Sequence, residues 1–107
     1  MKTQVTILHH DYPARVRDFV EGKIQTLARF HERAISIRAN LERQSEDHRV
    51  ELIANVGRGA VLVADAKGEA LGPVLEEALD RMARQMKRHH DKVTRDRHRG
   101  GRSGHVA

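Results

Sequence analysis

The chain has 107 residues, with 20 Lys and Arg against 15 Asp and Glu, and its formal net charge at pH 7 is +5. This is the size of one domain with a modest core. Because cysteine is absent, a disulfide framework, thiolate metal ligands and a cysteine nucleophile are excluded. The N-terminus does not resemble a signal peptide, and no apolar run approaches the roughly 20 residues that span a bilayer. We therefore expect a cytoplasmic protein without membrane contact.

Residues 3–8 alternate between apolar and polar side chains, which predicts a half-buried strand. Asp11 is a residue type that caps helices and Pro13 is tolerated in a first turn, so a helix should follow. We expect this helix to run from Ala14 to about Arg33, because apolar residues recur there at helical spacing. These apolar residues are Val16, Phe19, Val20, Ile24, Leu27 and Phe30.

Three further segments alternate with the period of a strand, namely 35–42, 50–56 and 60–66. A polar turn over residues 44–47 separates the first two. The second and third are joined by Gly57-Arg58-Gly59, which predicts a tight hairpin because glycine adopts the positive φ that such turns need.

Gly72-Pro73 predicts the start of a second helix, since proline is favoured in a first turn. The helix should continue to about Thr94 or beyond, with an apolar stripe along one side. The stripe consists of Leu75, Leu79, Met82, Met86 and Val93. Residues 97–107 contain three glycines and no apolar periodicity. This composition predicts a mobile basic tail after a single domain of residues 1–96.

The expected order β-α-β-β-β-α is typical of an α+β domain with a four-stranded sheet and both helices packed on one face. The core should then lie between the helices and the sheet. We expect it to contain Phe19, Leu27, Phe30, Leu79, Met82 and Met86.

Positive charge is concentrated near the C-terminus. Residues 81–107 contain nine Lys and Arg and two Asp, net +7, whereas residues 1–80 have a net charge of −2.

On a helix, cations spaced by three and four residues fall on one side, away from the apolar stripe. These cations are Arg81, Arg84, Arg88, Lys92 and Arg95, with Lys87 beside them. A row of this kind suits successive phosphates. The alternative is a solvated face with ion-pair partners. Since the main nearby acids are Asp80 and Asp91, the pattern favours polyanion binding.

The first helix carries a weaker set on one flank, which consists of Arg15, Gly22, Thr26, Arg29 and Arg33. A plain solvent face explains this set nearly as well as a nucleic-acid contact. Lys23 falls inside the apolar arc of the same helix. Either its stem packs at the edge of the core while its ammonium reaches water, or packing holds the ammonium at a ligand surface.

Metal chemistry and catalysis find little support in the sequence. The adjacent pairs His9-His10 and His89-His90 diverge on a strand or a helix, and no metal-binding His motif, nucleophile elbow or P-loop occurs. We expect no metal, no cofactor, no small-molecule substrate and no enzymatic activity. Phe19 and Phe30 lie on the core stripe, which argues against a stacking platform for bases. Recognition should rest on phosphate, sugar and shape.

The segments VRDFVEGK (16–23) and LARF (27–30) form one helix motif, and LDRMARQMKRHHDK (79–92) forms another. They resemble the two helix motifs of the ribosome hibernation promoting factor and ribosome-associated inhibitor family, and the resemblance spans about residues 2–95. It implies a fold similar to double-stranded-RNA-binding domains. It also implies binding to the small ribosomal subunit, in the channel that mRNA and tRNA use, so that translation stalls in stationary or stressed cells. At Ala70-Leu71-Gly72, followed by Pro73, the chain departs from the family's Asp-Met-Tyr.

The resemblance points to Lys23, Arg84, Lys87, Arg88 and Lys92 as rRNA contacts, and these overlap the row found from charge spacing. The full candidate rRNA-binding set is Lys23, Arg29, Arg33, Arg81, Arg84, Lys87, Arg88, Lys92 and Arg95.

We therefore expect a translation inhibitor whose partner is small-subunit rRNA, with ribosomal proteins as further contacts. The alternative is a regulatory protein-binding module, such as a modulator of an alternative sigma factor, that uses the free sheet face. The acidic residues Glu42, Glu46, Asp47 and Glu51 would then carry the contact. Salt separates the two, because phosphate binding weakens steeply with ionic strength and an apolar protein contact does not.

Overall fold

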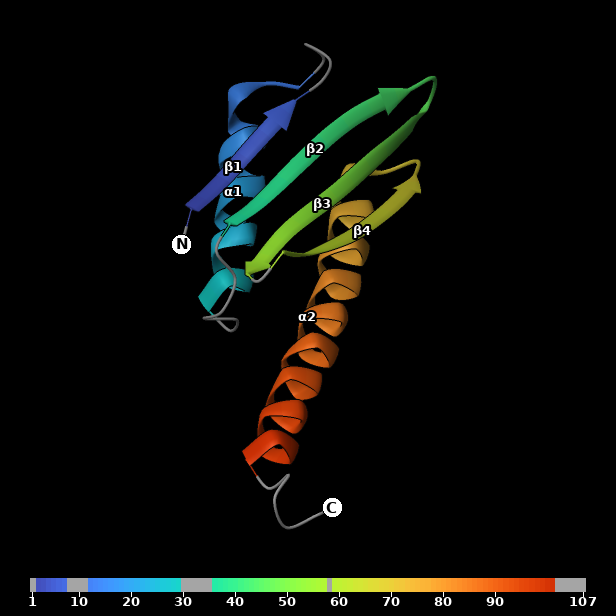
Figure 1. Ribbon diagram of the computed structural model, residues 1–107. Helices are drawn as coiled ribbons and strands as arrows, with labels where there is room; N and C mark the ends of the chain where they lie inside the picture. Colours follow the sequence, from blue (N-terminus) through green and yellow to red (C-terminus); the bar gives the residue numbers. More distant parts are fainter. Residues whose placement is uncertain (1, 8–11, 30–35, 58, 102–107) are drawn as a thin grey trace.

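The computed structural model describes residues 2–7, 12–29, 36–57 and 59–101 (Figure 1). Its elements follow the expected order. They are β1 (Lys2–Ile7), α1 (Ala14–Arg29), β2 (Ser36–Gln44), β3 (Asp47–Gly57), β4 (Ala60–Gly68) and α2 (Leu71–Gly101). The expected positions Leu8, Asp11, Phe30, Arg33 and Ile35 lie outside the described residues, so the helix cap at Asp11 and the end of the first helix at Arg33 stay predictions.

The four strands form one sheet in the order β1-β2-β3-β4. β1 runs parallel to β2, and β2, β3 and β4 are antiparallel to their neighbours. Both helices lie behind the sheet in Figure 1, with α1 against β1 and β2 and α2 against β3 and β4. The α+β class with two helices is therefore confirmed. The helices leave the other face of the sheet open.

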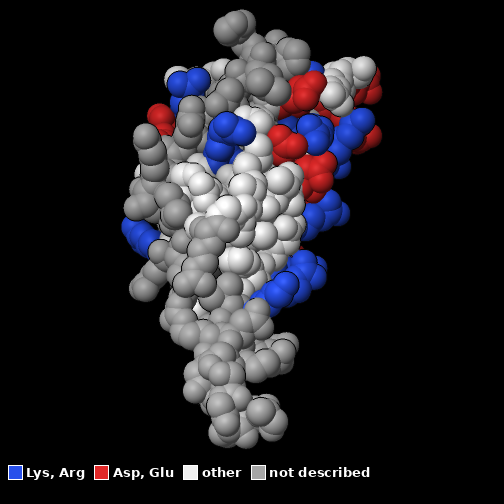
Figure 2. Space-filling view, viewed as in Figure 1, with Lys and Arg blue, Asp and Glu red and all other residues white. Residues whose placement is uncertain are grey.

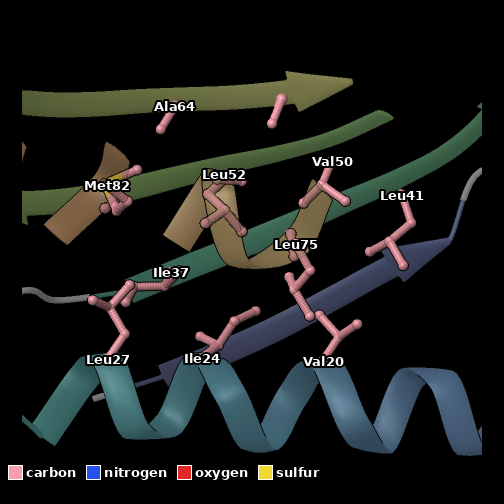
Figure 3. Packing of buried hydrophobic residues seen from close by; sticks show 14 of the residues in the cluster. Val20, Ile24, Leu27, Ile37, Leu41, Val50, Leu52, Ala64, Leu75 and Met82 are labelled. Atoms are coloured by element: carbon pink, nitrogen blue, oxygen red, sulfur yellow. The ribbon is translucent and has the colours of Figure 1, made fainter. Parts of the chain in front are cut away.

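Strand register explains why one face of the sheet is apolar. Leu41 pairs with Val50, and Leu52 pairs with Ala64, so these residues lie on the same face. All four are buried, as are Ile37 on β2, Val20 and Ile24 on α1, and Leu75 and Met82 on α2 (Figure 3). The predicted core positions Leu27, Met82 and Met86 are confirmed. Alanine at 64 and 66 on β4 and at 78 on α2 leaves little side chain between this strand and this helix.

The prediction that Phe19 lies in the core is wrong, because its side chain is half-exposed. The buried stripe of α1 consists of Val20, Ile24 and Leu27. Phe19 lies about 100° away from Val20 around the helix, on the flank. The apolar pattern is therefore wider than the arc that the sheet covers. Leu79 is also less buried than expected, although it packs against the core cluster.

The turns follow the backbone freedom of their residues. Gly57 and Gly59 have φ of 89° and 76°, which confirms the role expected for glycine in this hairpin. Arg58 between them lies outside the described residues. The turn between β2 and β3 holds Ser45 at φ 56°, a conformation that non-glycine residues adopt rarely.

The last helix extends beyond the apolar stripe that predicts it. α2 begins at Leu71, and Pro73 lies in its first turn as expected, where the missing N–H costs no hydrogen bond. It continues to Gly101, so residues 97–101 are helical, and the mobility of the expected tail stays a prediction. No proline interrupts this stretch, and the helix ends at a Gly-Gly pair. Residues 102–107 lie outside the described part of the chain.

Candidate nucleic-acid interface

The predicted row of cations lies on the exposed side of α2. Arg81, Arg84, Arg88 and Lys92 are exposed, as is Lys87 beside them, whereas Met82 and Met86 on the other side are buried. This division follows from the helical spacing, since the row and the apolar stripe are centred on different sides of the helix axis. Arg95 is part of the same helix, but its side chain is not described. We call the four described members together with Lys87 the α2 cations.

Two of the α2 cations have carboxylate partners four residues before them. Arg81 forms an ion pair with Glu77, and Arg84 lies 2.7 Å from a carboxylate oxygen of Asp80. An acid that precedes a base by four residues is the favourable order on a helix. The expectation that partners are scarce is therefore wrong for Arg81 and Arg84, which fit the alternative of a solvated, ion-paired face.

The other three α2 cations have no such partner. Among the described residues, no ion pair involves Lys87, Arg88 or Lys92. All three follow Met86, which is the last buried residue in the described part of α2. In Figure 1 this part of the helix extends past the end of the sheet. No described carboxylate therefore forms an ion pair with these three side chains.

Lys23 on α1 reaches across to α2. Its Nζ atom lies 3.0 Å from a carboxylate oxygen of Glu76 and 5.6 Å from the centre of the Phe19 ring. The ammonium is therefore at the surface, as both sequence interpretations required. The Phe19 ring and the Glu76 carboxylate hold the ammonium in this position.

The rest of the α1 flank is less organised. Arg29 is exposed at the end of α1, and Arg15 and Gly22 are exposed further up. Thr26 donates a hydrogen bond to the Gly22 carbonyl, 3.1 Å away, which is a contact within the helix. Arg33 lies outside the described residues.

Two side chains of α2 bind the edge strand, and sequence reasoning missed both roles. Arg81 donates to the carbonyl oxygen of Asp65, and Gln85 Nε2 donates to that of Val63 at 2.7 Å. β4 is an edge strand of the sheet, so these two bonds occupy carbonyl groups along its outer side and cover part of that edge. The signal was readable, because Arg81 and Gln85 are long donors four residues apart beside the apolar stripe.

The open sheet face carries a network of charges. The guanidinium of Arg49 lies 3.2 Å from Asp65 and 3.4 Å from Glu51, and Asn40 donates to Glu51 at 3.1 Å. The hydrogen bond to Asp65 is the main reason why the pKa of Arg49 is raised above its ordinary value. Figure 2 shows acidic side chains gathered at the upper right, with several Lys and Arg among and below them.

The acids proposed for a protein contact do not form one free surface. Glu51 belongs to the network around Arg49, and Asp47 lies 3.8 Å from Lys67 Nζ. Glu42 accepts a hydrogen bond from Gln44 at 2.8 Å, and Glu46 is exposed in the β2–β3 turn. Elsewhere, the hydroxyl of Tyr12 lies 2.6 Å from His48 Nδ1, which ties the start of α1 to β3.

The described residues contain no group of three or more His, Cys, Asp or Glu placed to hold a metal ion. Nor does any helix among them combine the length and apolarity needed to cross a membrane. The features that stand out are exposed cations on two helices that cover one face of a small α+β sheet.

The comparisons with known proteins give the family. The chain belongs to the family described as "Sigma 54 modulation protein / S30EA ribosomal protein", which matches residues 3–94. A relative is the ribosome hibernation promoting factor of Azotobacter vinelandii, 31% identical over 91 residues that cover 83% of this chain and 84% of the relative. The family resemblance is thus confirmed. Members of the family are ribosome hibernation factors and not enzymes, so the expectation that the chain is not an enzyme is confirmed as well.

Two solved structures share the fold. A ribosomal subunit interface protein from Coxiella burnetii superposes with a TM-score of 0.75 at 14% identity, over 85% of this chain and 99% of that one. The N-terminal domain of Protein Y from Thermus thermophilus gives a TM-score of 0.64 at 22% identity, over 82% of this chain and 94% of that one.

Proposed function

We propose that this protein is a ribosome-associated translation inhibitor. It binds rRNA of the small subunit in the channel that mRNA and tRNA use, and it does so through basic residues of α1 and α2. Family membership and the names of the relatives support a ribosomal partner. The observation that carries the RNA contact is a set of exposed cations on the part of α2 that extends past the sheet, and none of them forms an ion pair with another described residue. They are Lys87, Arg88 and Lys92. A protein with this partner acts in the cytoplasm.

The geometry of the α2 cations suits a phosphate backbone. Residues three or four apart on a helix are separated by about 5 to 6 Å along the axis. Guanidinium groups bind phosphate oxygens through charge-assisted, often bidentate hydrogen bonds. Arg88 and Lys92 supply the first contacts, and Lys87 flanks them. Arg81, Arg84 and Lys23 contribute less, because each of them is already paired with a carboxylate.

Recognition of this kind depends on the shape and phosphate backbone of the RNA more than on its base sequence. By its family resemblance the fold is similar to double-stranded-RNA-binding domains, which recognise RNA largely by shape and phosphate contacts. The described side chains that face outward from the helices are charged far more often than aromatic. Ribosomal proteins are further contacts for the remaining charged surface.

A second candidate function is supported by the open sheet face. The family description names sigma 54 modulation as well as a ribosomal protein. A regulatory protein could dock on this face, which is open because both helices cover the opposite side. Val61 and Val63, about half-exposed at one end of β4, would supply apolar contact area.

Charge reversal separates the two functions. The variant Arg88→Glu/Lys92→Glu should lose co-sedimentation with purified small subunits, because each change replaces an attraction to phosphate by a repulsion. The matched control is Arg38→Glu/Arg43→Glu, which reverses two exposed cations of β2. It should retain binding. Both variants should keep the wild-type melting temperature, since all four side chains are exposed.

The opposite pattern would contradict the proposal. If the folded Arg88→Glu/Lys92→Glu protein still co-sediments while the β2 control does not, the ribosome contact lies on the sheet and not on α2. If the unaltered protein does not co-sediment with small subunits at all, the second candidate function is favoured. Repeating the assay at increasing salt adds an independent criterion. The RNA contact should weaken linearly in log affinity against log salt, by about 0.7 to 0.9 per phosphate neutralised.

A further inference from the structure

The two parts of α2 differ in how their cations are partnered. In the first part, three carboxylates each hold one cation. Glu76 lies 3.0 Å from Lys23, Asp80 lies 2.7 Å from Arg84, and Glu77 pairs with Arg81. We call Glu76, Glu77 and Asp80 the α2 carboxylates. Residues 76–84 have a net charge of −1, from these three acids and two arginines, whereas residues 87–92 have a net charge of +2, from three cations and Asp91.

Stability of the fold does not explain the α2 carboxylates. All six paired side chains are between 42% and 72% exposed, so water screens each pair. Exposed pairs of this kind contribute little to folding. None of the three acids satisfies a buried group, since the described core contains no buried polar or charged residue. Their main physical effect is to occupy cations that would otherwise attract phosphate.

This pairing sets where a phosphate backbone can lie along the helix. A phosphate that approaches Arg81 or Arg84 meets a carboxylate at hydrogen-bond distance from the same guanidinium, and the two anions repel each other. Near Arg88 and Lys92, the acid whose side chain the structure describes is Asp91, and it forms no ion pair within the described residues. A long duplex or a flexible strand laid along all of α2 is therefore disfavoured relative to RNA that contacts the segment after residue 86 and curves away before residue 80.

We propose that Glu76, Glu77 and Asp80 are specificity-determining residues of this interface. They disfavour phosphates along the first half of α2, fix the position of the RNA along the helix, and weaken the binding of generic nucleic acid. Rejection of wrong partners by placed repulsion is a general route to specificity. The inference rests on the proposed function, because it refines how the same helix selects its RNA.

The test is the neutralised variant Glu76→Gln/Glu77→Gln/Asp80→Asn. It frees Lys23, Arg81 and Arg84 at almost constant side-chain volume. Affinity for two generic probes, poly-uridylate and a random-sequence RNA duplex, should rise about three- to tenfold at low salt. The slope of log affinity against log salt should steepen by up to about 2 to 3, since three more cations can neutralise phosphates. Affinity for small subunits should rise less, so that the ratio of small-subunit affinity to generic-RNA affinity falls.

The matched control is Asp18→Asn/Glu46→Gln/Glu69→Gln. It makes the same change of net charge, from +5 to +8, at exposed acids on α1, the β2–β3 turn and the β4–α2 junction. It should leave the ratio near that of the unaltered protein. Asp80→Asn alone is a second variant, and it removes only the ion pair with Arg84, which lies within one helix. It should raise generic-RNA affinity in the same direction, so it tests the idea even if the triple variant unfolds.

Two results would overturn the inference. One is a triple variant that binds the generic probes no better than the control. The other is an equal gain for generic RNA and for small subunits, since the carboxylates would then lower affinity without selecting a partner. Failure of the proposed function itself gives a different result, in which Arg88→Glu/Lys92→Glu binds small subunits as well as the unaltered protein does.

Discussion

The two parts of α2 have different tasks, although they form one continuous helix of 31 residues. Residues 71–86 supply Leu75, Ala78, Met82 and Met86 to the core, and their exposed arginines are paired. Residues after 86 extend past the sheet, and the described cations there are unpaired. The difference teaches that charge alone does not mark a binding surface. What distinguishes the second part is charge that the fold itself leaves unneutralised.

The largest expected effect tests the packed part. Leu75→Ala should lower the free energy of unfolding by about 2 to 5 kcal/mol, because Leu75 is fully buried between the helices and the sheet. Leu79→Ala is the control one turn later. Its side chain lies at the margin of the core, so the loss should be about 1 to 2 kcal/mol. Urea denaturation measures both. Equal losses would mean that α2 is rotated about its axis relative to this structure.

A truncation tests the protruding part. Removing residues 97–107 deletes Arg97, Arg99 and Arg102. We expect affinity for small subunits to fall and the salt slope to flatten by up to about 2 to 3. The melting temperature should stay nearly unchanged, because the last buried residue described in α2 is Met86. Calorimetry is the check. A fall of several degrees would show that the C-terminal end belongs to the folded core, and the division of α2 into two parts would be wrong.

Much of the fold could be predicted because the apolar residues keep strict periods. The alternation in β2, β3 and β4 gave their buried faces, and the glycines at 57 and 59 gave the hairpin. The errors have physical causes. Periodicity does not say how wide an arc the sheet will cover, so Phe19 was misplaced. Apolar spacing could locate α2 only as far as about Thr94, because a helix that leaves the core needs no apolar stripe.

The candidate site, like the fold, could be predicted only in part. Exposure of Arg84, Arg88 and Lys92 followed from spacing, because opposite sides of a helix are fixed by its geometry. The pairs within α2 were also readable as acids four residues before bases. The contact between Lys23 and Glu76 was not, since it depends on how two helices far apart in sequence lie against the sheet. The roles of all these residues in binding RNA stay predictions until the variants are measured.

The smallest expected effect tests how the two parts are joined. Gln85 donates to the carbonyl of Val63 just before α2 leaves the sheet. Gln85→Ala removes this bond and should cost about 0.5 to 1.5 kcal/mol, the usual net value of one hydrogen bond. The control is Gln25→Ala on α1, an exposed position that forms no hydrogen bond with another described residue. It should change the free energy of unfolding by less than about 0.5 kcal/mol. The cations after residue 86 depend on α2 for their direction. Gln85→Ala should therefore also lower RNA affinity slightly. An unaltered free energy of unfolding would show that packing of Met82 and Met86 fixes the helix on β4 without help from the edge-strand carbonyl.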